Sequence, residues 1–562
     1  MKRIVIIGGG WAGCAAAVAA AKSGVQVSLL ERTDMLLGLG NVGGIMRNNG
    51  RFTAAEENIA MGASELFEIT DSCATHKNVS FPGHEHATFY NVIKVEPAVR
   101  ELLRKMGIEV RFMARVVDAV VQVDAAKVGA VKLAGGELVE GDVFIDCTGT
   151  TGPMGNCLQH GNGCSMCVLR CPSFGPRVSI TEKVFGSDYC AMRGATASAR
   201  EGGESLGVAG SRASTREGGE SLGVAGSRAS AREGGESLGV ANSLGVGNAA
   251  AAPPAAPPAA ALGAFSGSCK LDKASLSEDI QKELNERGVA IVPLPEELIN
   301  RKKLGQKVCQ QYALDPYAEN IILIDTGFAK MMTPYFPLED LRRVDGFQQA
   351  RFIDPYAAGK GNSVRYMAVA RRDEFLRARG EAAGAATSRT AANSLGGTNS
   401  LGRQAAPPPA AASNSLGRQG VQVAPPAASV QAAEDAAAGR RAASSGRAGE
   451  GGVSNLFCGG EKAGLIVGHT EAITTGILAG FNGARKALSR PFLKLPETTA
   501  IGLLVAMSGR EITSAEDLER RYTFAGEEVF QEMKEKGLYS TDVNAIRKRI
   551  EEAGLEDIYN QW

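Results

Sequence analysis

Residues 1–32 read MKRIVIIGGGWAGCAAAVAAAKSGVQVSLLER. An apolar run at residues 3–7 ends in a glycine-rich turn, an alanine-rich stretch follows, and a second apolar run at residues 25–30 ends at Glu31. This order is typical of a strand, a glycine turn, a helix and a second strand that closes on an acidic residue. The stretch therefore predicts the first βαβ unit of a parallel, nucleotide-binding sheet.

Each glycine of the turn has a separate physical role in such a unit. Gly8 makes the tight turn, Gly10 lets the backbone approach a pyrophosphate, and Gly13 lets helix and strand pack closely. The start of the helix then offers free N–H groups to the phosphates. Glu31 lies eighteen residues after Gly13, where a carboxylate can accept hydrogen bonds from ribose hydroxyls. The alternative interpretation is an ordinary βαβ unit whose glycines only make a turn.

Two later stretches decide between a nicotinamide and a flavin nucleotide. Residues 143–149 form a buried-type strand that runs into Thr148-Gly149, and residues 455–461 form another that ends in glycines and Glu461. Gly468-His469-Thr470 then opens a long helix that extends to residue 488. A simple NAD dehydrogenase does not need these stretches, whereas a two-part FAD site does. An acid after a strand can hold ribityl hydroxyls, and a helix start can stabilise the anionic edge of a reduced flavin.

A second glycine-rich segment, residues 36–44, ends in Gly43-Gly44. Such a loop lets backbone lie against a flat or charged ligand, although a flexible connection has the same composition. Further along, residues 54–70 and 96–106 predict helices, and residues 108–113, 116–123 and 128–133 predict short strands. These patterns indicate an α/β fold.

The composition limits the class of protein. Lysine plus arginine and aspartate plus glutamate are both 61 among 562 residues, so no global charge favours nucleic acid or an acidic membrane. Eleven cysteines in a chain of this length do not indicate a secreted disulfide scaffold, and no signal peptide precedes the first strand. No apolar run is long enough to span a membrane. We expect a cytoplasmic protein that acts on a small-molecule substrate or an electron-transfer partner.

Two low-complexity segments interrupt the pattern. Residues 191–268 contain a repeated unit of sixteen residues and an Ala/Pro tract, and residues 374–452 repeat Asn-Ser-Leu-Gly among Ala, Pro, Ser and Gly. Their units carry too few apolar residues to bury a core, so we expect disordered insertions, with an interaction or localisation tail as the alternative. The remaining chain divides into a first FAD-binding part, an inserted α+β substrate domain, a second FAD-binding part and a helical C-terminal segment, at 1–190, 269–373, 453–510 and 511–562.

With these residues in hand, the sequence resembles the FAD-dependent oxidoreductases that have the glutathione reductase-like nucleotide fold. It looks most like their branch of tRNA-modifying flavoproteins, the glucose-inhibited division protein A family and the folate/FAD-dependent tRNA uridine methyltransferase. The resemblance covers residues 1–150 and 453–510 and includes LFCGGE at 456–461, GILAG at 476–480 and PETTAIG at 496–502. It implies an FAD site in which Glu31 binds the adenosine ribose, Val116 lies by the adenine, and Thr148-Gly149 pack near the pyrophosphate. It also implies that Glu461 and residues 468–470 serve the ribityl chain and the flavin ring. The predicted cofactor-binding residues are Gly8, Gly10, Gly13, Glu31, Arg32, Gly43, Gly44, Val116, Thr148, Gly149, Gly460, Glu461, Gly468, His469 and Thr470.

The chain departs from the methyltransferase in one respect. The early catalytic cysteine motif of that enzyme has no counterpart here, because Cys14 lies inside the first predicted helix and Cys73 has unlike neighbours. Modification of tRNA uridines is therefore the alternative function rather than the main one.

A cluster of four cysteines follows the predicted strand at residues 143–149, in the order Cys-x6-Cys-x2-Cys-x3-Cys-Pro. Its members are Cys157, Cys164, Cys167 and Cys171. The last part resembles half of a ferredoxin run, which favours a [4Fe–4S] cluster, although the first spacing differs from that run. Zinc, a redox-active pair of Cys164 and Cys167, and unligated buried thiols are the alternatives. Cys190 is a spare ligand, and His160 is predicted to lie in a surface loop.

Two other groups of residues could react. His84 and His86 flank Glu85 and could bind a metal, but histidines in a polar loop are usually solvated. Cys147 and Cys458 each end a strand near the predicted cofactor, and we expect them to be small buried residues. The main predicted function is an FAD-dependent oxidoreductase that passes electrons between an unknown substrate and the flavin, with a [4Fe–4S] cluster as a route. A non-catalytic FAD and zinc scaffold is a further alternative.

Overall fold

The computed structural model describes residues 1–122, 126–149, 174–175, 177–185, 270–306, 310–333, 336–353, 369–380, 453–513, 517 and 520–562. The first predicted insertion and nearly all of the second lie outside these residues. So do the predicted metal ligands Cys157, Cys164, Cys167 and Cys171, together with Cys190 and His160.

The fold is α/β and is organised around one five-stranded sheet. The strands lie in the order β15-β10-β1-β2-β6, and every neighbouring pair is parallel. Their bounds are Arg3–Ile7 (β1), Gln26–Leu30 (β2), Glu109–Arg111 (β6), Val143–Asp146 (β10) and Leu456–Cys458 (β15). Asp146 pairs with Cys458, so the late strand completes the sheet that the first residues begin. The predicted fold class and two-part sheet are confirmed.

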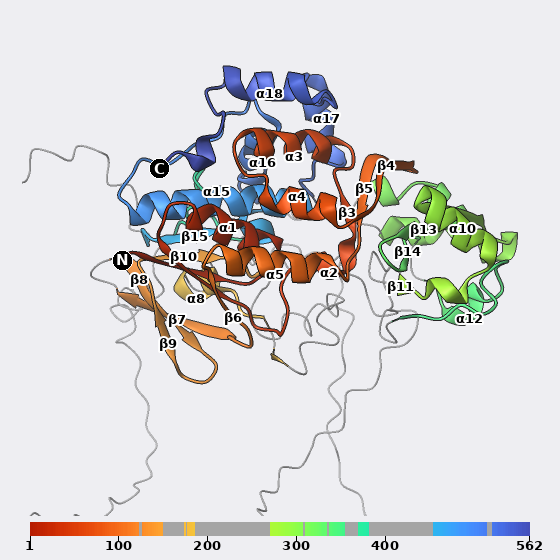
Figure 1. Ribbon diagram of the computed structural model, residues 1–562, viewed down its shortest axis with the longest axis horizontal. Coiled ribbons are helices and arrows are strands. Elements are labelled where there is room, and N and C mark those ends of the chain that lie inside the picture. Colours follow the sequence, from red (N-terminus) through yellow and green to blue (C-terminus); the bar gives the residue numbers. More distant parts are fainter. Residues whose placement is uncertain are drawn as a thin grey trace, which may run out of the picture. The chain divides into compact units, whose positions relative to one another are not determined.

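The two faces of this sheet carry different layers. Successive side chains of a strand point to opposite faces, so Ile4 and Ile6 join the core under the helices, whereas Val5 and Ile7 join a second core. Figure 1 shows helices on one side of the sheet and a three-stranded antiparallel sheet on the other. The helices are α1 (Trp11–Ala21), α5 (Val95–Lys105) and α15 (His469–Ala487). The second layer contains β7 (Val116–Gln122), β8 (Lys127–Leu133), β9 (Leu138–Glu140) and α8 (Ile180–Phe185).

Helices α1 and α15 lie unusually close together because both present small residues. A Cβ on Gly476 would overlap the carbonyl oxygen of Ala12, and one on Gly480 would overlap that of Ala16. Glycine at these two positions is therefore a packing requirement of the helix pair. The contact joins the helix that follows β1 to the helix that follows β15, although the two helices lie far apart in the sequence.

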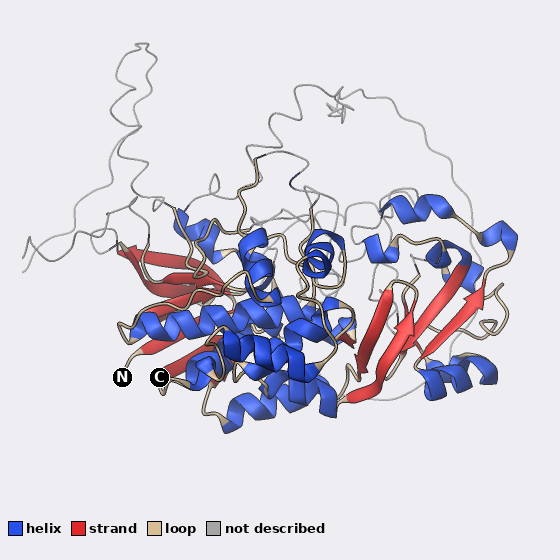
Figure 2. Ribbon diagram, turned by 90° about the horizontal axis from the view of Figure 1, so that it is seen from above, coloured by secondary structure: helices blue, strands red, loops and turns tan. Residues whose placement is uncertain are grey.

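Three further groups of elements surround this core (Figure 2). A hairpin with a short third strand consists of β3 (Ile45–Met46), β4 (Ala74–Phe81) and β5 (His84–Tyr90). A second sheet, in the order β11-β14-β13-β12, is antiparallel and contains β11 (Lys270–Leu271), β12 (Val289–Pro293), β13 (Asn320–Asp325) and β14 (Ala329–Met331), with helix α10 (Glu278–Arg287) packed on it. The C-terminal helices are α16 (Ala500–Ser508), α17 (Glu527–Glu535) and α18 (Val543–Glu552). Short helices are α2 (Gly40–Gly43), α11 (Pro316–Glu319) and α12 (Leu338–Leu341), and 3-10 turns lie at Lys273–Ser275, Glu296–Leu298, Arg301–Gln306, Gln310–Tyr312, Gly460–Ala463 and Ile558–Asn560.

The single helix predicted over residues 54–70 is wrong. The chain forms α3 (Gly50–Ala60) and then α4 (Glu65–Ser72). Gly62 lies between them with a φ of +90°, which interrupts a helix. Glu57 of α3 is fully buried, and its carboxylate accepts the N–H groups of Ala500 and Ile501, both at 3.0 Å, which fixes α3 against the start of α16.

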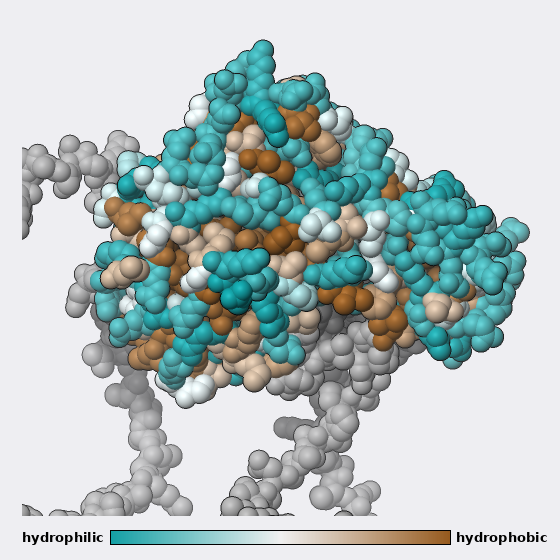
Figure 3. Space-filling view, viewed as in Figure 1, coloured by the Kyte–Doolittle hydropathy of each residue, from teal (hydrophilic) through white to brown (hydrophobic). Residues whose placement is uncertain are grey.

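Figure 3 shows hydrophilic residues over much of one face, with apolar residues in separate groups between them. That distribution is usual for a surface in contact with water. Within the described part of the chain, no helix combines the length and the apolar character needed to cross a bilayer.

Candidate nucleotide-binding site

The three glycines of the first turn have different surroundings. Gly8 has a φ of +99°, and a Cβ there would lie 2.5 Å from the carbonyl oxygen of Cys147. A Cβ on Gly13 would overlap the carbonyl oxygen of Gly8. The Cβ position of Gly10, in contrast, has no protein atom within 4 Å. Packing thus explains Gly8 and Gly13, while the space at Gly10 is compatible with the predicted approach of a pyrophosphate.

Gly10 is also the N-cap residue of α1, and no side chain caps that helix. The N–H groups of the first turn of a helix have no partner within the helix and carry part of the positive end of its dipole. They therefore suit the oxygens of a pyrophosphate placed beside Gly10.

Glu31 lies at the edge of this turn, at the carboxyl end of β2. Its Oε2 accepts the N–H of Gly9 at 2.7 Å, and its Oε1 accepts the N–H and the hydroxyl of Thr33 at 2.8 and 2.9 Å. These bonds fix a largely buried carboxylate next to the open space at Gly10. An ionised carboxylate has about four acceptor positions, so Glu31 keeps capacity for ribose hydroxyls.

Val116, which is predicted to lie by the adenine, belongs to the chain that follows β6. The N–H of Ala114 donates to the carbonyl oxygen of Glu31 at 2.9 Å, and Val116 is buried two residues later at the start of β7. The side chain of Arg32 donates to the carbonyl oxygen of Gly175. Val116 and Arg32 thus both lie in the neighbourhood of Glu31.

The strand ends β10 and β15 bring a second set of predicted residues to the same edge of the sheet. The Cβ position of Gly149 lies 3.8 Å from Glu461 Oε2, and that of Gly460 lies 2.8 Å from Ala12 Cβ. Thr148 is fixed by Asp146, whose buried carboxylate accepts the N–H and the hydroxyl of Thr148 at 3.1 and 2.7 Å. Thr148, Gly149, Gly460 and Glu461 therefore gather beside the start of α1.

Arg177 was not expected from the sequence at this place. Its Nη1 lies 3.2 Å from the Cβ position of Gly149, close to Glu461. Arg177 precedes α8 in a short stretch without a regular pattern, so only the fold brings its guanidinium to this edge. A planar guanidinium suits recognition of phosphate oxygens.

The glycine-rich segment at residues 36–44 connects the two halves of the candidate site. The N–H of Leu37 donates to the carbonyl oxygen of Gly9 at 2.7 Å, and the Cβ position of Gly38 lies 3.9 Å from the Cα of Gly10. At its other end, a Cβ on Gly43 would overlap the ring of His469, and Gly44 has a φ of +77°. The segment therefore runs from the first glycine turn to the start of α15.

His469 stands in the first turn of α15 and faces this loop. The hydroxyl of Tyr90 lies 3.1 Å from His469 Nδ1 and donates to the carbonyl oxygen of Gly40 at 2.7 Å. Burial lowers the pKa of His469 to about 3, and the positive charges of Arg51 and Lys330 act in the same direction. The imidazole is thus neutral near pH 7, and the ring is a polar but uncharged wall.

The rest of the α15 start is held by a buried ion pair. Arg51 Nε lies 2.9 Å from Glu471 Oε1, and both side chains are almost fully buried. Gly468, the N-cap residue, has a φ of +133°, and a Cβ there would overlap the carboxylate of Glu471. The hydroxyl of buried Thr470 donates to Met46 Sδ at 3.1 Å. The first turn of α15 is therefore rigidly placed opposite the loop.

Three of the described cysteines are buried among the core elements. Cys14, Cys147 and Cys458 carry free thiols with almost no exposed surface. Burial raises the pKa of all three thiols, that of Cys458 to about 12. A thiol is a poor nucleophile unless it ionises, which agrees with the prediction for Cys147 and Cys458.

The interpretation of His84 as a solvated loop residue is wrong. His84 begins strand β5 and has 1% of its surface exposed, because its ring packs between the hairpin and residues 310–317. In the described ranges, no group of three or more His, Cys, Asp and Glu side chains is arranged to hold a metal ion.

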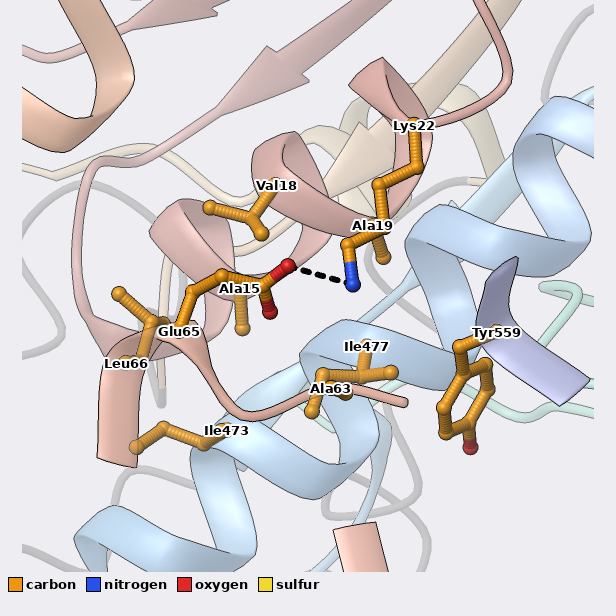
Figure 4. Close-up of a pocket in the computed structure, with 10 residues that line it drawn as sticks. All are labelled: Ala15, Val18, Ala19, Lys22, Ala63, Glu65, Leu66, Ile473, Ile477 and Tyr559. Carbon is orange, nitrogen blue, oxygen red and sulfur yellow. Dashed lines mark ion pairs between the residues drawn. The ribbon is translucent and has the colours of Figure 1, made fainter. Parts of the chain in front are cut away.

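One pocket lies further along α1, away from the glycine turn. It is lined by Ala15, Val18, Ala19, Lys22, Ala63, Glu65, Leu66, Ile473, Ile477 and Tyr559 (Figure 4). The ion pair between Lys22 and Glu65, at 2.5 Å, crosses it. None of the predicted cofactor-binding residues lines this pocket, so it is separate from the candidate site.

The glycine turn, Glu31 and strand β10 all lie in a part of the chain that matches a known protein family. Residues 3–200 match the glucose inhibited division protein A family. The resemblance found in the sequence is thereby confirmed for this part of the chain, and the match supports an FAD-dependent flavoprotein. No curated protein matches the chain.

Among solved structures, the chain is similar to two crystal forms of GidA from Aquifex aeolicus. For form II the identity is 13% and the TM-score 0.48, with 98% of this chain and 76% of that chain covered. For form I the identity is 13% and the TM-score 0.47, with 98% and 78% covered. The Diels-Alderase PyrE3 shares 22% identity over 27% of this chain and 33% of its own, with a TM-score of 0.21.

Proposed function

We propose that this chain binds FAD, with the AMP half of the cofactor at the first glycine turn. The observation that carries this proposal is the free space at Gly10 beside the uncapped start of α1 and the fixed carboxylate of Glu31. The match of residues 3–200 to the glucose inhibited division protein A family supports it. When bound, the flavin supplies hydride or two-electron transfer chemistry.

In this proposal the chain's own residues bind and orient the cofactor. Glu31 would hold the ribose, and Thr148, Gly149 and Arg177 would approach the pyrophosphate. Glu461 would serve the ribityl hydroxyls, and the first turn of α15, with His469, would face the flavin ring. Arg32, Val116, Gly43 and Gly44 would complete the walls. We also propose that the domains have the boundaries predicted from the sequence.

We further propose that the substrate is a uridine of tRNA, which the flavoenzyme modifies by transfer of a carbon unit. The support is the family match, because the resemblance to glucose-inhibited division protein A implies this class of reaction. The total charge of the chain is neutral, but tRNA contacts only one face of a protein. A neutral total charge is therefore compatible with tRNA binding at a local basic surface.

Two measurements test the proposal in sequence. Purified full-length protein should show flavin absorption bands, and denaturation should release FAD; a colourless protein that takes up no added FAD would reject the cofactor assignment. The FAD-loaded protein is then incubated with unmodified tRNA, a reductant and a labelled folate donor of one-carbon units. Appearance of label in a uridine nucleoside, detected by mass spectrometry, is the expected result. If the protein binds FAD but neither labels uridine nor binds tRNA, the tRNA assignment is rejected while the FAD assignment stands.

A second candidate is electron transfer between the flavin and a [4Fe–4S] cluster. The observation that favours it is the Cys-x2-Cys-x3-Cys-Pro spacing at Cys164, Cys167 and Cys171, with Cys157 as the fourth ligand. Iron, sulfide and zinc analysis of protein purified without oxygen decides the question. Flavin without iron would reject the cluster, and stoichiometric zinc would favour the scaffold instead.

A further inference from the structure

The carboxylate of Glu471 lies directly at the start of α15. Glu471 is the third residue of this helix, and Gly468 is its N-cap residue. A Cβ on Gly468 would overlap Glu471 Oε2 and Arg51 Nη2. The buried ion pair of Arg51 and Glu471 therefore lies against the N-cap residue, at the helix start that would face the flavin ring.

Among the described residues, three groups donate hydrogen bonds to this carboxylate. Arg51 Nε lies 2.9 and 3.0 Å from its two oxygens. The hydroxyl of Thr523 and the N–H of Phe524 both donate to Oε1 at 2.8 Å. Hydrogen bonds to an ionised carboxylate are strong and compensate its charge. Two of the three donor groups thus come from the C-terminal part of the chain.

The hydroxyl of Thr523 is oriented by its other hydrogen bonds. Arg51 Nη2 donates to Thr523 Oγ1 at 3.0 Å, and the N–H of Ala525 donates to the same oxygen at 3.1 Å. A hydroxyl has two acceptor positions and one proton, so these bonds leave the proton for Glu471. Thr523 and Glu471 are both fully buried, and bulk water does not replace this donor.

The backbone of the same segment pairs with the chain that leads into α15. The N–H of Val467 donates to the carbonyl oxygen of Tyr522 at 3.0 Å, and the N–H of Tyr522 donates to that of Leu465 at 2.9 Å. Arg51 Nη2 also donates to the carbonyl oxygen of Val467 at 3.2 Å. Residues 522–525 are therefore fixed against the turn whose carboxylate they compensate.

The position of this charge matters for any anion at the helix start. The first N–H groups of a helix carry part of a positive charge, which stabilises a negative group placed against them. A carboxylate in the same turn opposes this effect by its negative charge, and donors that compensate the carboxylate weaken that opposition. A flavin gains negative charge when it is reduced, so it would sense this balance.

We propose that Glu471 is a positioning residue that sets the charge at the start of α15, and that the hydroxyl of Thr523 keeps this charge compensated. The inference rests on the proposed binding of FAD with its flavin ring at this turn. Residues 522–525 thereby tune the reduction potential of the flavin through Glu471, with no need to touch the cofactor.

Variants of the full-length protein loaded with FAD test this inference by spectroelectrochemical titration. Thr523→Val removes the hydroxyl at nearly constant volume, so the two-electron midpoint potential should fall by about 15 mV or more, a roughly threefold change in the preference for reduced over oxidised flavin. Thr523→Ser keeps the hydroxyl and should retain the wild-type potential. Glu471→Gln removes the negative charge, so the potential should rise.

Thr53→Val is the matched control. The hydroxyl of Thr53 is also buried and also holds the C-terminal part of the chain, but it donates to the carbonyl oxygen of Ser540, at 2.7 Å. Thr53→Val should therefore lower stability without changing the potential. A shift in this control equal to that of Thr523→Val would overturn the inference, because loosening of the segment would then be the cause.

The signs of the shifts separate a role in charge from a role in folding. Shifts of the same sign in Thr523→Val and Glu471→Gln, or unchanged potentials, would overturn the inference while the FAD assignment stands. If Glu471→Gln does not fold, the comparison of Thr523→Val with Thr523→Ser decides alone, and equal potentials in these two variants reject the inference. A wild-type protein that binds no FAD would reject the proposed function and this inference with it.

Discussion

At the scale of single residues, one substitution at each glycine of the first turn can distinguish a role in binding from a role in packing. Gly10→Ala places a methyl group in free space, so folding should be nearly unchanged. The same methyl group would meet the pyrophosphate, and FAD affinity should fall at least tenfold, about 1.4 kcal/mol. Equilibrium titration with FAD and urea unfolding measure the two effects.

Two other glycines are the controls for this prediction. Gly13→Ala would overlap the carbonyl oxygen of Gly8, so its free energy of unfolding should fall by about 1–3 kcal/mol. Gly135 also has no atom within 4 Å of its Cβ position, but it lies in the turn before β9. Gly135→Ala should bind FAD normally. Unchanged FAD affinity in Gly10→Ala would contradict the assignment of the phosphate site.

The buried histidines predict how stability depends on pH. The pKa of His84 is lowered to about 3, so the folded state disfavours the proton that the unfolded chain binds below about pH 6.5. The contribution of His84 to the free energy of unfolding is fully present above pH 6.5 and is lost as the pH falls towards 3. The stability lost between pH 7.5 and pH 5 should amount to about 2 kcal/mol. His469 adds a contribution of the same sign over the same window.

Urea unfolding at pH 7.5 and pH 5 measures this effect. His84→Phe should reduce the difference in stability between the two pH values by about 2 kcal/mol. His86→Phe, in a partly exposed residue of the same strand, is the matched control. An equal difference in His84→Phe and in the wild type would show that His84 does not carry the effect.

At the scale of secondary-structure elements, the contact between α1 and α15 depends on glycine. Gly476→Ala places a methyl group on the carbonyl oxygen of Ala12, where neither helix backbone can yield easily. The free energy of unfolding should fall by about 1–3 kcal/mol despite the better helix propensity of alanine. Chemical unfolding followed by circular dichroism measures this.

Gly483→Ala, seven residues along the same helix, is the control for that variant. Its Cβ would lie 3.1 Å from a terminal methyl group of Ile145, which is a side chain that can move. The free energy of unfolding of Gly483→Ala should be clearly higher than that of Gly476→Ala. Equal losses in the two variants would mean that the backbone contact at Ala12 is not the cause.

Sequence patterns predict some elements well and others poorly. Buried strands such as β1 and β10 are continuous apolar runs, and the predicted helix at residues 96–106 lies within one residue of α5. The sequence does not predict the hairpin β4–β5, because its first strand, ATHKNVSF, is mostly polar and shows no alternation of apolar and polar residues. Its second strand buries His84, which looks like a loop residue in a run of histidines and glutamate. Tertiary packing overrides local preference in these places.

At the scale of the whole molecule, the chain on either side of residues 381–452 lies close together. Ala378 donates its N–H to the carbonyl oxygen of Leu456, and Cys458 donates to that of Leu376, both at 2.9 Å. The two segments thus pair in an antiparallel manner at the outer edge of β15. A short linker can span the same two ends.

Replacement of residues 381–452 by six residues should therefore leave the sheet and the FAD affinity intact. Shortening the connection from about 70 residues should raise the free energy of unfolding by up to about 2 kcal/mol, through a smaller loop-closure entropy. Thermal unfolding and FAD titration of the shortened protein test this. Loss of FAD binding would show that the removed segment takes part in the site.

The sequence predicted which strands lie side by side at the candidate site, but not every residue that meets there. Gly8 and Glu31 follow from motif spacing, and Gly149 follows from the family resemblance and its position at a strand end, since the ends of neighbouring parallel strands share one edge of a sheet. Arg177 has no local signal, since long-range packing alone brings it into place. The ligation of the four clustered cysteines stays a prediction.

The pairing of β10 with β15 has a consequence for synthesis on the ribosome. About 300 residues separate these strands, which corresponds to roughly 15–60 s of elongation at typical rates. During that time β10 has no neighbour on one side and the alanine face of α1 has no helix against it. We expect the nascent N-terminal region to expose the unpaired edge of β10 until β15 emerges, and the alanine face of α1 until α15 emerges. The region should require chaperones that shield these surfaces.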